Sequence, residues 1–228
     1  MFLRKRLMSR RGFVINTKYK HVIWDWNGTL FNDVNWCFKT INTLLARRGM
    51  KILKDIPEYH SVFCFPVIEY YKNVGFDFDI EPFEVLAEEF MELYRSNKSG
   101  GCGLFPGAES ILSTIKDTGV SQVLLSASHM SDLLMQINEF DVTGYFDELL
   151  GLTDIYAKSK IDIGREYIKR TGITDVVLIG DTKHDYEVAQ ALGADCILIP
   201  NGHNSKDSLL SCEVPVLNDI SDVIEVLL

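Results

Sequence analysis

The side chains that could perform chemistry stand where apolar segments of this sequence end. The β-rich run His21–Trp26 carries Asp25 near its end, and a second apolar run ends at Ser126. The most strand-like run, Asp175–Asp181 (DVVLIGD), ends in a carboxylate. Runs of this length that are rich in Val, Ile and Leu suit strands buried on both faces of a parallel sheet. Because open α/β sheets bind ligands beyond the carboxyl ends of their strands, we expect these groups to share one crevice.

Further acids and lysines follow close behind these runs. Asp185 comes four residues after Asp181, and Lys158 and Lys160 stand just before the next helical pattern. Carboxylates gathered around Asp25 would repel one another unless a hard cation lay among them, and oxygen ligands suit Mg²⁺. A hydroxyl and an ammonium group beside them would bind the remaining oxygens of a phosphoryl group.

The elements that must position these groups alternate between strand and helix from Phe105 onward. Such alternation predicts right-handed βαβ crossovers and a parallel sheet. Residues 55–98 instead show consecutive helical patterns, and Asp33 is expected to cap a helix before them. We therefore predict an α/β fold, in which a three-layer, Rossmann-like parallel sheet core carries an inserted all-helical cap subdomain. The expected core strands are 21–26, 122–126, 147–152, 175–181 and 196–200, and the expected core helices include 131–138, 160–170, 185–192 and 219–227.

The same patterns divide the chain. We assign residues 19–33 and 104–228 to the α/β core and residues 34–103 to the helical cap, with hinges near 30–34 and 99–104. Residues 1–18 form a basic N-terminal extension that could be disordered. Residues 1–20 contain seven Lys or Arg and no acid. That composition is compatible with a transit peptide, a disordered extension, or a true start at Met8.

Composition excludes several classes of protein. A formal net charge of −9 argues against a nucleic-acid-binding surface. No apolar run approaches the roughly 18 residues that are needed to span a membrane. The five cysteines are odd in number, scattered and without CxxC spacing, which indicates a reducing compartment and no zinc site. We therefore expect a cytoplasmic protein that acts on a small molecule.

In order along the chain, these segments resemble the motifs of the haloacid dehalogenase superfamily, most of whose members are phosphatases. The motif D-x-D-G-T appears as Asp25-Trp26-Asn27-Gly28-Thr29, and G-D-x-x-x-D appears as Gly180–Asp185. An apolar strand that ends in Ser126 and a lysine ahead of a helix match the remaining two motifs. The helical insertion stands where phosphoglycolate-phosphatase-like members carry an α-helical cap.

The resemblance implies a nucleophile and a metal site. Asp25 would take up the phosphoryl group as an aspartyl-phosphate. Mg²⁺ would be held by the Asp25 carboxylate, the Asn27 backbone carbonyl and Asp181, with Asp185 nearby or linked through water. Gly28 would let the backbone approach this site closely.

The resemblance also implies a phosphate-binding set. The Ser126 hydroxyl and the backbone amides after it, beginning with Ala127, would hold phosphate oxygens. A lysine would neutralise charge on Asp25 and on the substrate. Lys158 and Lys160 both fit that motif, and we prefer Lys160 because it directly precedes the periodic helix. The expected activity is Mg²⁺-dependent hydrolysis of a small phosphorylated metabolite.

Asn27 is a departure from the family pattern. Phosphatases of this family usually have a second Asp here, which protonates the leaving oxygen and later activates water. An amide cannot exchange a proton at neutral pH, and positioned acid–base groups contribute about 10²–10⁴ in rate. The alternatives are therefore an acyl-phosphate- or phosphonate-cleaving enzyme, or a weakly active or non-catalytic phosphate-binding protein. Phosphonate cleavage would require a cap lysine as a Schiff base, from Lys39, Lys51, Lys54 or Lys72.

Two histidines and a set of aromatic side chains remain as candidates near the crevice. His184 and His203 each follow a core strand, and His184 is the better candidate for the missing acid–base role. A plain polar loop residue is the alternative for both. The cap carries enough aromatic side chains for an apolar seam against the core: Phe63, Phe65, Tyr70, Tyr71, Phe76 and Phe78.

Overall fold

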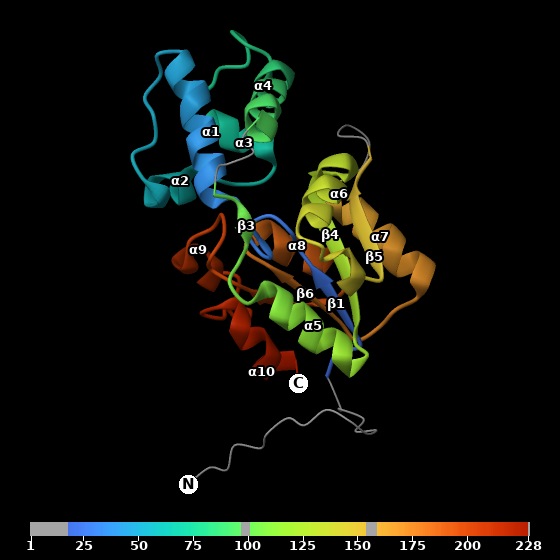
Figure 1. Cartoon of the computed structure of the whole chain (residues 1–228). Coiled ribbons are helices and arrows are strands. Elements are labelled where there is room, and N and C mark those ends of the chain that lie inside the picture. Colours follow the sequence, from blue (N-terminus) through green and yellow to red (C-terminus); the bar gives the residue numbers. More distant parts are fainter. Residues whose placement is uncertain (1–17, 97–100, 154–158, 228) are drawn as a thin grey trace.

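A parallel sheet lies at the centre of the computed structural model, which describes residues 18–96, 101–153 and 159–227. Within these residues, five strands pair in the order β5-β4-β1-β6-β7 (Figure 1). β1 lies in the middle and pairs in parallel with both β4 and β6. The strands are β1 (His21–Trp24), β4 (Ser121–His129), β5 (Glu148–Leu152), β6 (Val176–Gly180) and β7 (Asp195–Leu198).

Helices cover both faces of this sheet. Val22 and Trp24 of β1 join a hydrophobic cluster with α5, α6 and α10, whereas Ile23 joins a second cluster with α7, α8 and α9. The predicted three-layer, Rossmann-like α/β core is thereby confirmed. The core helices are α5 (Ala108–Thr118), α6 (Met130–Glu139), α7 (Lys160–Thr171), α8 (Lys183–Leu192), α9 (Lys206–Leu210) and α10 (Val223–Leu227), with 3-10 turns η1 (Thr143–Tyr145) and η2 (Ile220–Asp222).

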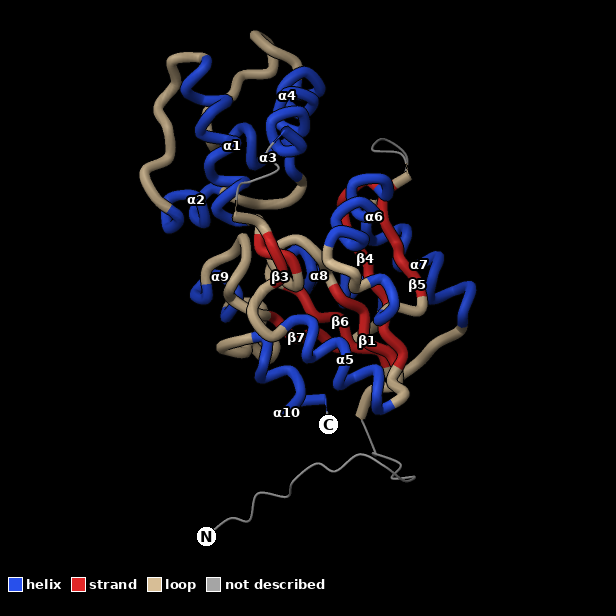
Figure 2. Tube along the Cα trace, in the orientation of Figure 1, coloured by secondary structure: helices blue, strands red, loops and turns tan. Residues whose placement is uncertain are grey.

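The inserted segment forms a separate group of helices beside the sheet, as expected for a helical cap (Figure 2). It has a hydrophobic cluster of its own, which includes Ile41, Leu44 and Leu86. The cap helices are α1 (Val34–Arg47), α2 (Ile56–Val62), α3 (Val67–Asn73) and α4 (Phe83–Ser96). We propose that the boundaries between core and cap lie between residues 33 and 34 and between residues 103 and 104.

The two segments that connect cap and core pair with each other. β2 (Phe31–Asn32) and β3 (Gly103–Leu104) form a short antiparallel ladder, which the sequence patterns did not predict. Both crossings between cap and core therefore lie side by side. Residues 99 and 100 of the predicted second hinge, and residues 1–17 of the predicted extension, lie outside the described residues.

Some elements differ from their predicted bounds. β4 continues beyond Ser126 to His129, and its pairing with β5 shifts register between Leu125 and His129. Ala127, Ser128 and His129 are all half-buried and show no alternation of apolar and polar residues from which the extension could have been predicted. α9 was also not predicted, because a helix of five residues shows little periodicity. In the part of the chain that is described, no helix combines the length and apolar character that a membrane crossing requires.

A buried glutamine in the central sheet provides a test of this packing. Gln122 of β4 accepts a hydrogen bond from Trp24 Nε1 (3.0 Å) and donates one to the Leu112 carbonyl oxygen (2.9 Å). Gln122→Leu should lower the free energy of unfolding, because each polar group left buried without a partner costs about 1–3 kcal/mol. Urea denaturation measures the change. The same substitution at exposed Gln190 is the control, expected within about 0.5 kcal/mol of wild type, and equal stability of the two variants would contradict the prediction.

Candidate active site

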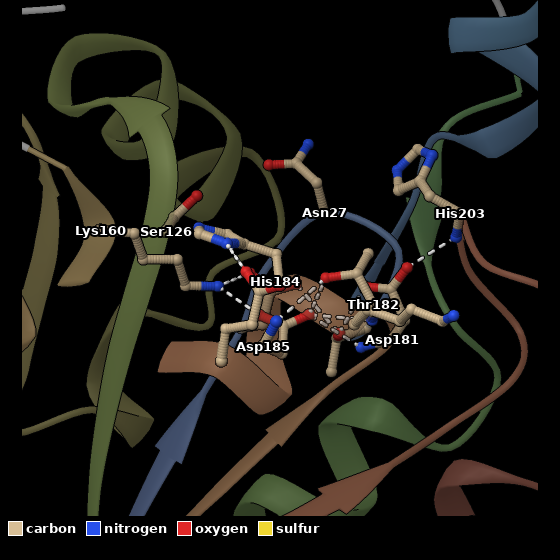
Figure 3. A network of polar contacts seen from close by, with 12 residues as sticks. Asn27, Ser126, Lys160, Asp181, Thr182, His184, Asp185 and His203 are labelled. Carbon is tan, nitrogen blue, oxygen red and sulfur yellow. Dashed lines mark hydrogen bonds and ion pairs between the residues drawn. The ribbon is translucent and has the colours of Figure 1, made fainter. Parts of the chain in front are cut away.

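Three carboxylates from different elements meet at the edge of the sheet that faces the cap. Asp25 follows β1, Asp181 follows β6, and Asp185 lies in the first turn of α8. One oxygen of each lies within 4.8 Å of the others, and all three residues are buried. Figure 3 shows Asp181, Asp185 and Lys160 converging here. The structure thus brings together the predicted nucleophile and the predicted metal-binding acids.

Lys160 is the cation of this cluster. Its Nζ lies 2.5 Å from Asp25 Oδ1 and 2.6 Å from Asp185 Oδ1, and only 4% of the residue is exposed. Burial would lower the pKa of Lys160, but Asp185 and Asp25 raise it, so the ammonium form is favoured. Lys158, the other lysine that fits the motif, lies outside the described residues.

The three carboxylates have different electrostatic environments. Burial raises the pKa of Asp25 to about 6, with Lys160 opposing the shift. Burial would also raise the pKa of Asp185, but Lys160 and the Thr182 hydroxyl lower it. The pKa of Asp181 is raised well above its usual range, first by burial and then by the neighbouring acids Asp25 and Asp185, against the opposing effect of His203.

A divalent cation fits this donor set. The ligand atoms are carboxylate oxygens, which suit a hard cation such as Mg²⁺. Lys160 forms ion pairs with Asp25 and Asp185, whereas burial raises the pKa of Asp181 and so disfavours its charged form. A cation among the three would relieve that imbalance.

Two loops approach the carboxylates closely. The Thr29 hydroxyl lies 3.0 Å from Asp25 Oδ2 and 3.0 Å from Asp181 Oδ1, and therefore bridges the acids of two strands. Gly28 has a φ of +82°, which favours glycine. A Cβ added at Gly28 or Gly202 would collide with the carboxylate of Asp181. Close approach of the backbone, which was predicted for Gly28, is thus required at both glycines.

The remaining predicted phosphate-binding residues lie in the irregular part of β4. The Ser126 hydroxyl oxygen accepts the backbone N–H of Ser128 (3.0 Å), and Ser126 is buried. Ala127 is partly exposed. The Asn27 side chain lies close to this stretch, because its Oδ1 accepts a hydrogen bond from the Ser128 hydroxyl (2.8 Å).

Asp33 has a different role from the one predicted. It occupies the N-cap position of α1, but its side chain makes no capping hydrogen bond. Instead Oδ2 accepts hydrogen bonds from Asn27 Nδ2 (2.8 Å) and the Tyr94 hydroxyl (2.7 Å), and Oδ1 lies 3.2 Å from His203 Nε2. An aspartate before a helix looks the same in the sequence whether it caps that helix or accepts hydrogen bonds from distant residues. Only the contacts in the structure distinguish the two roles.

His203 is the partner of Asp33. Burial alone would lower the pKa of His203, but the Asp33 carboxylate raises it to about 9. In turn, His203 and its hydrogen bond outweigh burial and lower the pKa of Asp33. The other ring nitrogen, Nδ1, lies 2.8 Å from the Tyr59 hydroxyl. Both ring nitrogens are therefore engaged.

His184 is placed differently from His203. It stacks on Phe65 at 4.7 Å between ring centroids, and its Nδ1 lies 3.2 Å from Glu187 Oε2. Neither contact directs it toward Asp25, so the structure does not favour it for the acid–base role.

The comparison with protein families decides the class of this protein. A family model described as haloacid dehalogenase-like hydrolase matches residues 22–199. The chain belongs to the haloacid dehalogenase-like hydrolases. Membership confirms the resemblance seen in the motifs, and the helical insertion is consistent with the caps of this family.

The proteins that resemble this chain have low sequence identity to it. A phosphoglycolate phosphatase of Photorhabdus laumondii is 22% identical over 144 residues, which cover 60% of this chain and 60% of the relative's length. A haloacid dehalogenase-like hydrolase of Streptococcus pneumoniae superimposes with a TM-score of 0.78 at 16% identity, over 91% of this chain and 98% of that one. Protein tyrosine kinase A of Mycobacterium tuberculosis superimposes with a TM-score of 0.76 at 19% identity, over 91% and 97% of the two chains. At these identities the structures establish the fold alone.

Gly202→Ala should weaken binding of a divalent cation without disrupting the sheet. The added methyl group would collide with the Asp181 carboxylate and with the backbone oxygen of Gly28, and changes that disturb a metal ligand's support typically cost about 10–100-fold in affinity. Calorimetric titration with Mg²⁺ measures the dissociation constant. Gly144→Ala is the matched control, since a Cβ there would meet nothing within 4 Å. Equal Mg²⁺ affinity of the two variants would show that Asp181 does not hold the cation.

Proposed function

We propose that this chain is a phosphatase that hydrolyses a small phosphorylated metabolite through a covalent intermediate on Asp25. The observation that carries the proposal is the buried Asp25 carboxylate, which contacts Lys160 and lies within 4.8 Å of the Asp181 and Asp185 ligand oxygens. Family membership and the phosphoglycolate phosphatase relative support this reaction class.

The proposed reaction has two displacements at phosphorus. In the first, a carboxylate oxygen of Asp25 bonds to phosphorus, and the P–O bond to the alcohol breaks with its electron pair going to the alcohol oxygen. That oxygen takes a proton from water, and the hydroxide left behind is neutralised by the proton that the second displacement releases. In the second, water attacks phosphorus, the bond to Asp25 breaks, and the carboxylate, inorganic phosphate and a proton are released. Splitting hydrolysis in this way replaces one difficult step by two easier ones.

The residues around Asp25 would orient it and bind the phosphoryl group. Lys160 would hold one Asp25 oxygen in place and attract the anionic substrate. The Ser126 hydroxyl, whose oxygen already accepts an N–H, can direct its own proton to a phosphate oxygen, with the Ala127 amide beside it. Asp25, Asp181, Asp185 and the Asn27 carbonyl would hold Mg²⁺, which when bound would neutralise charge between nucleophile and substrate.

Asn27 determines how well the substrate's leaving group must depart without being protonated by the enzyme. Its Nδ2 donates hydrogen bonds to Asp33 Oδ2 (2.8 Å) and to the Tyr94 hydroxyl oxygen (3.3 Å), and its Oδ1 accepts one from the Ser128 hydroxyl. Because a carboxamide neither loses nor gains a proton near neutral pH, this side chain cannot act as the acid–base group. This favours an acyl phosphate, whose leaving group needs little protonation, as the second candidate substrate class. The phosphonate alternative is less well supported, because each of the cap lysines named for it is exposed: Lys39, Lys51, Lys54 and Lys72.

The compartment and partners are part of the same proposal. All five cysteines are free, which suits a reducing compartment, and we propose the cytoplasm. The partner we propose is the small phosphorylated substrate, and the charge of −9 continues to argue against nucleic acid.

Asp25→Asn should abolish turnover. The substitution keeps the shape of the side chain but removes the nucleophilic carboxylate, so hydrolysis of p-nitrophenyl phosphate and acetyl phosphate should fall to below about one thousandth of the wild-type rate. Circular dichroism and thermal unfolding check that the fold is kept. Retention of wild-type activity by a folded variant would rule out Asp25 as the nucleophile.

Exchanging the side chains at positions 27 and 33 tests the role of the amide. Asn27→Asp alone would set a second carboxylate 2.8 Å from Asp33, and it should destabilise the protein. Asn27→Asp combined with Asp33→Asn restores a donor–acceptor pair and puts a carboxyl group at the family's acid–base position. The double variant should hydrolyse p-nitrophenyl phosphate about 10²-fold faster than wild type, with a smaller gain on acetyl phosphate. A folded double variant with no gain on either substrate would favour a different chemistry.

A further inference from the structure

His203 connects the carboxylate cluster to the cap. Its backbone N–H donates to Asp181 Oδ2 (2.6 Å), as Figure 3 shows, while its ring points toward the cap. Only 5% of the residue is exposed. One residue thus contacts a proposed metal ligand through its main chain and the cap through its side chain.

The cap side of this connection comes from α2 and the residue that follows it. The Tyr59 hydroxyl lies 2.8 Å from His203 Nδ1, and the Phe63 ring stacks on the His203 ring at 4.8 Å and 25°. His60 Nε2 lies 3.0 Å from the carbonyl oxygen of Gly202. The end of one short cap helix therefore holds two consecutive residues of the core loop beside Asp181.

The predicted aromatic seam is divided accordingly. Phe63 and Phe65 stack on core histidines, whereas Tyr70, Tyr71 and Phe76 pack within the hydrophobic cluster of the cap itself. Next to the three carboxylates, the cap therefore contacts the core through a small number of aromatic side chains, which can be substituted one at a time.

The opposite edge of the His203 ring faces the loop that follows β1 and contains Gly28. Nε2 contacts Asp33, which also binds Asn27 and Tyr94 of α4. A Cβ added at Gly28 would lie 2.7 Å from His203 Cδ2, so the ring packs directly against this loop. Its position is therefore set jointly by the loop at Gly28, by Asp33 in the first connecting segment and by the cap.

We propose that His203 is a positioning residue that couples the place of the cap to the place of the Asp181 carboxylate. When α2 is seated, Tyr59 and Phe63 hold the ring, and the ring holds the backbone N–H that orients Asp181. When α2 moves away, that N–H loses its fixed position and the cation site loosens. The proposal rests on the proposed function, in so far as Asp181 belongs to the metal site.

Coupling of this kind is reciprocal. If seating the cap increases the affinity for Mg²⁺, then Mg²⁺ must favour the seated cap by the same factor. Both directions can be measured without any substrate.

Two tyrosines of the cap provide a matched pair of variants. Tyr59→Phe removes the hydroxyl that contacts His203. Tyr70→Phe removes a buried hydroxyl that has no hydrogen-bond partner among the described residues, although Tyr70 packs against Tyr59 in the same cluster. The variants have the same change of composition and differ in the contact to the core.

The readouts are Mg²⁺ affinity by calorimetry and hydrogen exchange of residues 56–62 with and without Mg²⁺. Tyr59→Phe should weaken Mg²⁺ binding by about fivefold or more and reduce the Mg²⁺-dependent protection of α2, whereas Tyr70→Phe should match wild type in both. His203→Leu should weaken Mg²⁺ binding at least as much, and His203→Gln, which keeps a donor for Asp33, should restore part of it.

The outcomes separate the two proposals. Normal Mg²⁺ binding and equal exchange in Tyr59→Phe and Tyr70→Phe would overturn the coupling and leave the phosphatase proposal intact. Absence of Mg²⁺ binding in the wild-type protein would overturn both. A loss in Tyr59→Phe alone supports the coupling, whatever the substrate is.

Discussion

The burial of three carboxylates at one edge of a sheet is the constraint on which the rest of this structure depends. Asp25, Asp181 and Asp185 cannot all remain charged there without compensation, because removing an ion from water costs several kcal/mol. Lys160 compensates two of them, and backbone amides at the start of α8 contact Asp185. The raised pKa of Asp181 marks the charge that is least compensated. A divalent cation would be the simplest way to balance the charge of Asp181. The loops at Gly28 and Gly202 pass close to this carboxylate, so their backbone atoms lie near enough to contribute to such a site.

A second polar network explains why an amide is tolerated at position 27. The Asp33 carboxylate needs donors, and Asn27 supplies one where an aspartate would add a second acceptor. His203 supplies the opposite charge, and Tyr94 a further donor from the cap. The residue that departs from the family's acid–base pattern is thus part of a charge-balanced seam between core and cap. The amide of Asn27 donates a hydrogen bond to Asp33 because it is not a carboxylate, and for the same reason it cannot transfer a proton.

The fold by itself does not decide the reaction. A protein tyrosine kinase and a haloacid dehalogenase-like hydrolase both superimpose on this chain over nine tenths of its length. Function must therefore be argued from side chains. Here Lys160 contacts both Asp185 and Asp25, the proposed nucleophile, whereas Asn27 stands where the resemblance would place the group that protonates a leaving alcohol. That difference directs attention to substrates with good leaving groups.

The sequence by itself determined the α/β core, the helical insertion and the strand-end residues Asp25 and Asp181, because apolar periodicity and breaks at Gly or Pro are local properties. It could not predict the β2–β3 ladder, since two-residue strands carry no pattern. Nor could it assign Asp33 or His203, because a helix cap and a loop histidine look the same whatever they contact. Only the tertiary structure brought these two together from 170 positions apart in the chain. Burial and charge pairing arise from such distant contacts, and therefore the seam between cap and core was decided by folding.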